Sequence, residues 1–291
     1  MSYARVYLHI VGFLGLIIAY PFATSVSASD SENGQYEAEE LHRYFKNEAD
    51  GYEMIYKGEK LKLRSQPLMH WSNPQRNQEQ GATYIWTKDQ VPLVIVSIFT
   101  FEYNNVVRSR HEVISLADDA LECRLHDKLV WTPQTSGLEW TSITDTQAPA
   151  STPARRLFQM RTIARQFSGV LYSTWRPPNK LALIPQPLTR YQNPKQGLLD
   201  GAVFSLAVAT DPELLVVIEA RMDKGGKPVF RYAPVRSNYN KLELSRNGEL
   251  VKEFPLVLAL ESTKAHQKPW SDEPFFVFDP PSPLPEPGTI K

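Results

Sequence analysis

Two stretches of the chain carry the apolar spacing of an amphipathic helix. TPARRLFQMRTIARQFSG (residues 152–169) places four apolar side chains on one helical face: Leu157, Met160, Ala164 and Phe167. Thr152 can cap the start of this helix, and Pro153 suits its first turn. YEAEELHRYFKNEADG (residues 36–51) shows the pattern more weakly. The spacing therefore predicts one helix in each of these stretches.

The rest of the pattern predicts short strands separated by turns. Between residues 81 and 132 the expected strands are GATYIWT, PLVIVSIF, RHEVISLA, LECRL and KLVWT. Between residues 201 and 253 they are GAVFSLAV, ELLVVIEA, FRYAPVRS, LELS and ELVKE. β-branched and aromatic residues dominate these stretches, as is typical of strands. Asn247-Gly248 is a strong signal for a tight hairpin turn.

The two series of expected strands belong to segments that match each other. Residues 60–98 align with residues 180–218 without a gap, and 13 of the 39 positions are identical. The match opens with KLKLRSQPLMHWSNP in one segment and KLALIPQPLTRYQNP in the other. Average composition would give about two to three identities by chance. We infer an internal duplication.

Each half of the chain then predicts one helix followed by about five to seven strands. We expect an α+β protein of two tandem repeats, each a helix on a curved, mostly antiparallel sheet, cystatin-like or NTF2-like in outline. Such an outline implies no function. The expected repeats cover residues 33–135 and 153–256. We expect residues 136–152 to form a polar linker, and residues 257–291 a Pro-rich tail that is disordered or extended.

The N-terminus has the pattern of a secretory signal peptide. Arg5 precedes an apolar run of 15 residues, Val6 to Tyr20, and a cleavage position follows Ala28. A membrane-spanning helix needs roughly 20 apolar residues. We expect residues 1–28 to be removed and the protein to be exported to the periplasm, the cell envelope or the extracellular space. Membrane attachment through an uncleaved signal is the alternative.

Charge and cysteine content narrow the class of protein further. The 32 basic and 32 acidic residues cancel, whereas a general nucleic-acid binder has a basic excess, so we expect no nucleic-acid partner. The single cysteine, Cys123, leaves an exported chain without an intramolecular disulfide. Stability must then come from a packed core. The expected partner is a protein or a small ligand.

The sequence contains no established catalytic or cofactor-binding motif. G-x-S-x-G, H-E-x-x-H, the Walker loop and G-x-G-x-x-G are all missing, and one cysteine excludes a Cys-rich zinc site. We expect no cofactor and no metal. The catalytic candidates are His111, Glu112 and Asp118, which occur only in the first half. On a strand, His111 and Glu112 point to opposite faces, so they cannot act as a simple adjacent pair.

The matched segments supply candidate ligand-binding residues. Gln66 and Gln186 occupy equivalent positions, and so do Asn73 and Asn193, and Trp71 and Tyr191. The first interpretation is structural, because two copies of one fold need the same turns and the same core rings. The alternative is that these side chains line two equivalent sites for a ligand such as a carbohydrate.

Three stretches carry a resemblance: GATYIWTKDQVPLVIVSIF, HEVISLADDALECRLHDKLVWTP and QMRTIARQFSG. They resemble a group of exported bacterial proteins of uncharacterised activity. The resemblance covers most of the chain after the expected signal peptide. It implies a bacterial, exported protein and supplies no activity or site. We expect a non-enzymatic binding or structural protein. The alternative is a hydrolase or other enzyme with an unrecognised site near His111, Glu112 and Asp118.

Overall fold

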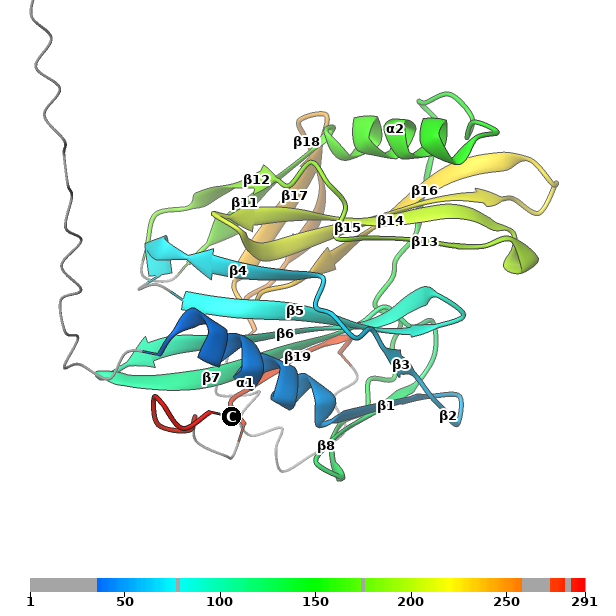
Figure 1. Cartoon of the computed structure of the whole chain (residues 1–291). Helices are drawn as coiled ribbons and strands as arrows, with labels where there is room; N and C mark the ends of the chain where they lie inside the picture. Colours follow the sequence, from blue (N-terminus) through cyan, green and yellow to red (C-terminus); the bar gives the residue numbers. More distant parts are fainter. Residues whose placement is uncertain (1–35, 77–78, 174–175, 258–272, 281–283, 291) are drawn as a thin grey trace, which may run out of the picture. The chain divides into compact units, whose positions relative to one another are not determined.

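The computed structural model describes residues 36–76, 79–173, 176–257, 273–280 and 284–290 (Figure 1). The expected signal peptide, residues 1–28, lies outside the described residues. In the part of the chain that is described, no helix is both long enough and apolar enough to cross a membrane. We call residues 36–135 the first half and residues 153–257 the second half.

The fold is mostly β, and the expected α+β pair of helix-plus-sheet repeats is wrong. Strands make up 53% of the described residues and helices 13%, and one sheet curls into a half-barrel. The described residues contain two α-helices, α1 (Ala38–Asp50) and α2 (Pro153–Ala164). Both lie within the stretches where the apolar spacing predicts a helix, but α2 ends at Ala164, and Phe167, expected on its apolar face, begins a strand. The helix α1 contacts β5 and β6, and α2 contacts β14 and β15 (Figure 1).

The described strands of the first half are divided between two sheets. The four-stranded sheet has the order β2-β1-β8-β9, with the bounds β1 (Tyr52–Tyr56), β2 (Glu59–Lys60), β8 (Leu121–Leu125) and β9 (Lys128–Trp131). The six-stranded sheet has the order β19-β7-β6-β5-β3, and β4 also pairs with β5. Its strands are β3 (Lys62–Leu63), β4 (Met69–Asn73), β5 (Glu79–Lys88), β6 (Val91–Tyr103), β7 (Val106–Ser115) and β19 (Phe275–Phe278).

The second half contributes to a single nine-stranded sheet. Its order is β10-β16-β15-β14-β12-β11-β17-β18, and β13 also pairs with β14. The bounds are β10 (Thr141–Ile143), β11 (Phe167–Tyr172), β12 (Asn179–Leu183), β13 (Thr189–Asn193), β14 (Leu198–Val208), β15 (Asp211–Met222), β16 (Pro228–Arg236), β17 (Lys241–Arg246) and β18 (Glu249–Phe254). Short 3₁₀ turns, η1 (Pro74–Arg76) and η2 (Pro194–Gln196), follow β4 and β13. Unlike the expected repeats, the two halves therefore do not build one equivalent sheet each.

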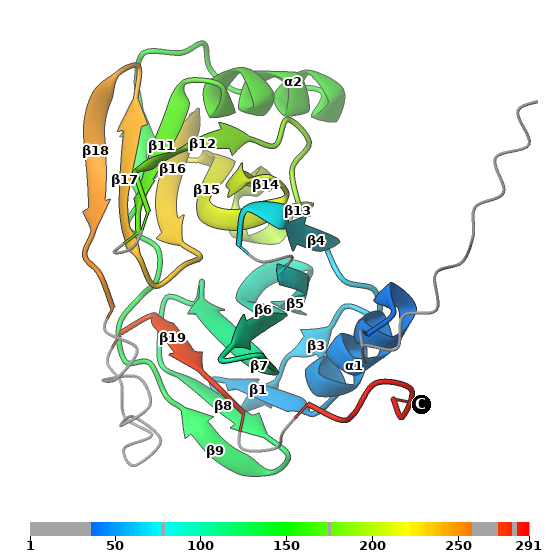
Figure 2. The ribbon, with the colours of Figure 1, turned by 90° about the vertical axis from the view of Figure 1, so that its left-hand side faces the viewer.

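Each half receives an edge strand from outside itself. The strand β10 lies in the expected linker, yet Ser142 pairs with Arg231 of β16. The strand β19 lies in the expected Pro-rich tail, yet Val277 pairs with Glu112 of β7 (Figure 2). All four residues of β19 are buried. The chain therefore crosses between the halves twice, and residues 275–278 of the expected tail belong to the folded core.

The matched segments pair with the same register. Trp71 lies opposite Gly81 in the first half, and Tyr191 lies opposite Gly201 in the second. A Cβ atom at Gly81 would meet Trp71 Cζ2 at 2.4 Å, and one at Gly201 would meet Tyr191 Cζ at 2.5 Å. Each ring therefore lies directly over its glycine. This packing explains why glycine stands at both matched positions.

Three hydrophobic clusters hold the described residues together. Leu41 and Phe45 of α1 pack with Trp86 in the first cluster. Met160 of α2 packs with Phe204 in the second. The third joins the halves and includes Ile85, Ile95, Tyr191, Leu198, Val203, Leu215, Val217 and Val277. Because β6 and β15 are covered on both faces over most of their length, each contains an uninterrupted apolar run, residues 91–96 and 214–218, rather than an alternating pattern.

Candidate functional site

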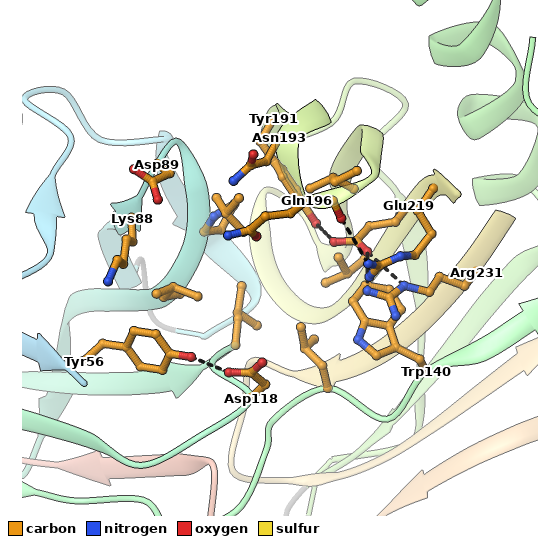
Figure 3. A pocket seen from close by; sticks show the side chains of 18 of the residues that line it. Tyr56, Lys88, Asp89, Asp118, Trp140, Tyr191, Asn193, Gln196, Glu219 and Arg231 are labelled. Carbon is orange, nitrogen blue, oxygen red and sulfur yellow. Dashed lines mark hydrogen bonds and ion pairs between the residues drawn. The ribbon is translucent and has the colours of Figure 1, made fainter. Parts of the chain in front are cut away.

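A pocket of about 370 Å³ lies between the two halves (Figure 3). One wall comes from the β1–β2 turn, the β5–β6 turn and the segment after β7. The other wall comes from β13, η2, β14, β15 and β16. Trp140, just before β10, closes one side. The pocket therefore exists only because the two halves pack against each other.

Buried hydrogen bonds and an ion pair fix the second-half wall. The hydroxyl of Tyr191 donates to Glu219 Oε1 at 3.0 Å. The guanidinium of Arg231 donates to Glu219 Oε2 through Nε at 2.9 Å and Nη2 at 2.5 Å. The same guanidinium lies 3.6 Å from the centre of the Trp140 ring. Two hydrogen bonds to one carboxylate oxygen, together with stacking on Trp140, hold Arg231 in one orientation, so this wall is rigid.

Electrostatics keeps these side chains in defined protonation states. Burial raises the pKa of Tyr191 well above its usual range, and the charge of Glu219 adds to the effect. Tyr191 is therefore a hydrogen-bond donor at neutral pH. Burial lowers the pKa of Arg231, while Glu219 opposes that shift. Glu219 and Arg231 therefore supply one acceptor-rich and one donor-rich group at the pocket surface.

The first-half wall is more exposed and carries both charge signs. The hydroxyl of Tyr56 donates to Asp118 Oδ1. Lys57 Nζ lies 3.7 Å from the same oxygen, and Lys88 Nζ lies 2.9 Å from Glu59 Oε2. These exposed pairs are weak in water and can exchange for ligand contacts.

Two amide side chains extend between the walls without partners of their own. Figure 3 shows Asn193 and Gln196 between Lys88 and Asp89 on one side and Glu219 on the other. No side-chain hydrogen bond of Asn193 or Gln196 occurs within the described residues. Asn193 is only 8% exposed. A nearly buried amide without a partner is a ready donor and acceptor for a ligand.

A second location between the halves is formed by the residues that match those of the open pocket, with the roles of the two halves exchanged. This matched location is closed by buried charges. Arg76 Nη1 lies 3.2 Å from Asp211 Oδ2, and Arg76 Nη2 lies 2.5 Å from Glu213 Oε1. Asn73 donates from Nδ2 to Asp211 Oδ2 at 3.0 Å. A cavity of only about 40 Å³ is left beside this cluster. Here the corresponding side chains fill the space that the larger pocket leaves open.

Three substitutions between the matched segments account for the difference. Arg76, Asp211 and Glu213 seal the closed location. Their counterparts at the open pocket are Gln196, Val91 and Leu93, in the same order. These three side chains cannot form ion pairs with one another. The pocket is therefore open because its sequence lacks the seal.

Several carboxyl groups in and beside this sealed location have raised pKa values because they are buried. Burial raises the pKa of Glu79 to about 7 and that of Asp211 to about 6, although Arg76 opposes both shifts. Burial also raises the pKa of Glu213 and of Glu112 well above the usual range. Four carboxyl groups cannot all ionise in a space this small and dry.

The catalytic candidates are not brought together. His111 is completely buried in the core, with Nδ1 at 2.7 Å from the Tyr52 hydroxyl, and burial lowers its pKa to about 3. Glu112 points to the other face of β7 and lines the closed cavity. Asp118 lines the open pocket. The three therefore lie in three different environments.

The ligand-binding candidates are also distributed. Tyr191 lines the open pocket and Trp71 the closed cavity, and both are largely buried. Gln66 lines a third pocket, beside α1. Gln186 accepts a hydrogen bond from Arg161. Of the four, only Tyr191 belongs to the pocket between the halves.

Sequence reasoning missed most of this pocket. Asn193 matches Asn73, and this identity was interpreted first as structural, with two equivalent binding sites as the alternative. Glu219, Arg231 and Trp140 carried no motif. One available signal was the loss of charge between matched positions, where Val91 stands for Asp211 and Leu93 for Glu213. That signal gains meaning only when the positions are known to face each other.

Among the described residues, no group of three or more His, Cys, Asp or Glu side chains could hold a metal ion. Comparisons of the chain with known protein families, with curated proteins and with solved structures found no match.

Proposed function

We propose that the protein is an exported, non-enzymatic binding protein that holds a small polyhydroxylated ligand, such as a mono- or disaccharide, between its two halves. The observation that carries this proposal is the open pocket at a place whose matched location is sealed. A volume of about 370 Å³ falls in the range of small-molecule sites. The N-terminal pattern of a signal peptide supports export.

The chemistry of the lining supports a neutral, hydroxyl-rich ligand. Asn193 and Gln196 offer unpartnered amides, which both donate to and accept from hydroxyl groups. Glu219 and Arg231 offer a fixed acceptor and a fixed donor. The rings of Tyr56 and Trp140 supply flat apolar surface for the faces of a sugar ring. Basic and acidic side chains both line the pocket, so no single sign of ligand charge is favoured.

The same lining favours binding over turnover. A general acid and base must both reach the reacting atoms. Of the catalytic candidates, only Asp118 lines this pocket. The carboxyl groups whose pKa values reach about 6 and about 7, Asp211 and Glu79, belong to the sealed location. A cavity of about 40 Å³ there has no room for a substrate.

The test is a thermal-shift and calorimetric titration with a panel of mono- and disaccharides. A ligand that binds only the folded protein raises stability by about 2.7 kcal/mol at a concentration of 100 times Kd. We expect saturable stabilisation by at least one sugar. The double variant Val91→Asp/Gln196→Arg restores a seal and should abolish that response.

Gln75→Ala serves as the control, because Gln75 does not line the pocket, and it should bind as the unchanged protein does. Equal binding by the sealed variant would mean that the ligand binds elsewhere. No saturable response to any sugar would exclude the proposed ligand class. Hydrolysis of a bound sugar would replace the binding function with an enzymatic one.

A further inference from the structure

We infer that the first half carries a second, independent site, which binds a small oxyanion in the pocket between α1 and the connection from β3 to β4. This pocket has a volume of about 300 Å³. His42, Arg43 and Lys46 of α1 face Gln66 and His70 across it. It lies apart from the pocket between the halves, and its lining comes only from the first half.

The lining is cationic. Two permanent cations, Arg43 and Lys46, line it together with two histidines, and no Asp or Glu does so. Asp50 pairs with Lys46 from outside the lining, with a side chain that is 53% exposed. Arg43 Nη2 donates to the Ile290 carbonyl at 3.3 Å, which leaves most of its five donors free. The local charge therefore suits an anion.

The two histidines are stacked face to face. The centres of the His42 and His70 rings lie 3.6 Å apart, with 29° between their planes. Burial lowers the pKa of His70, and the neighbouring charge of His42 adds to that shift. An anion beside the pair would offset this repulsion and favour the protonated rings. Oxyanion binding and histidine protonation should therefore strengthen each other.

A buried hydroxyl without a partner also belongs to the pocket. Tyr84 is 0% exposed, and its hydroxyl makes no hydrogen bond within the described residues. Burial raises the pKa of Tyr84, and the charge of Asp50 adds to that shift, so the hydroxyl stays a donor. Buried polar groups normally have partners. An oxyanion in this pocket would supply the missing acceptor.

The second half lacks these features at the matched positions. Phe204 stands in place of Tyr84, and Arg190 in place of His70. Arg190 already donates to Asp200, through Nε at 2.8 Å and Nη2 at 2.6 Å. The amide that matches Gln66 accepts from Arg161. The second half satisfies its own charges, whereas the first half leaves donors free.

The test uses inorganic sulfate, which keeps its charge across the pH range in which histidine titrates. Histidine ring signals are followed by NMR at pH 6 and at pH 8, with chloride holding the ionic strength constant. We expect saturable shifts of His42 and His70, with an affinity about tenfold higher at pH 6. Absence of a saturable shift at pH 6 would overturn the proposal.

Variants separate the site from general attraction to a basic surface. Tyr84→Phe should keep the fold, because phenylalanine stands at the matched position 204, and should weaken sulfate binding about tenfold. Lys46→Ala should weaken it as well. Arg161→Ala, a similar loss of charge on α2, should change nothing. Unchanged binding by the Tyr84 variant, or equal losses in the two charge variants, would refute the site.

Discussion

Arg76 of the first half reaches Glu213 of the second, with 2.5 Å between Arg76 Nη2 and Glu213 Oε1. The Glu213 side chain is 0% exposed and that of Arg76 is 18% exposed. Asp211 shares the same guanidinium. A buried ion pair of this kind stabilises the contact between the halves only while both partners are present, because either charge alone is costly to bury.

Arg76→Ala should destabilise the protein by about 3–5 kcal/mol, because it leaves buried carboxyl groups without their counter-charge. Chemical denaturation at pH 7 measures the loss. Gln196→Ala, at the matched position, should change the free energy of unfolding by less than about 0.5 kcal/mol. A loss below about 1 kcal/mol for the arginine variant would mean that Arg76 contributes little to the contact.

Glu79 should make stability fall as pH rises through its folded-state pKa. Burial raises this pKa from 4.5 to about 7. Protonated Glu79 therefore favours the folded state below pH 4.5, and that contribution is lost between pH 4.5 and 7. The raised pKa of Asp211, about 6, acts in the same direction.

The effect is measured as the free energy of unfolding at several pH values. Glu79→Gln should remove up to about 3 kcal/mol of the decline. Glu102→Gln on the exposed end of β6 is the control and should leave the curve unchanged. A curve that has the same slope in both variants would show that Glu79 does not titrate in this way.

Phe278→Ala should lower stability by about 3–5 kcal/mol, although the residue lies in a Pro-rich stretch. Phe278 is 1% exposed, and its ring centre lies 5.3 Å from that of His111. Thermal and urea unfolding measure the change. Leu250→Ala, at a residue that is 57% exposed, should have little effect. Near-equal stabilities of the two variants would argue that β19 is dispensable.

Gly81→Ala should be poorly tolerated, because its Cβ would lie 2.4 Å from Trp71 Cζ2. We expect a loss of about 1–3 kcal/mol from overpacking. Gly225→Ala is the matched control: the nearest atom to its Cβ lies at 3.4 Å, so the change should be small. Trp71→Leu in the Gly81→Ala background should recover part of the loss. Without such recovery, the ring is not the cause.

Much of the secondary structure could be predicted from the sequence. The apolar spacing predicts both helices and most strands, and the residues GATYIWT and PLVIVSIF lie in β5 and β6. Asn247-Gly248 stands at the turn between β17 and β18, with both residues at positive φ. These features depend on side-chain periodicity and turn chemistry, which neighbouring residues determine.

The fold class was not accessible in the same way. FFVF (residues 275–278) is an apolar run in a stretch whose proline content predicts a tail, and composition outweighed the local signal. Its pairing partner, β7, lies more than 160 residues earlier in the chain. No feature of the sequence near β7 or β19 indicates which sheet edge is left unpaired.

The sequence by itself determined both helices, most of the strands, the matched segments and the positions where charge was replaced by apolar side chains. Only the tertiary structure decided that β10 completes the sheet of the second half and that β19 completes a sheet of the first. It also decided that Val91, Leu93 and Gln196 face a common space. The reason is physical. Local elements follow from side chains a few residues apart, whereas edge pairing and pocket volume depend on which surfaces meet after distant segments have packed.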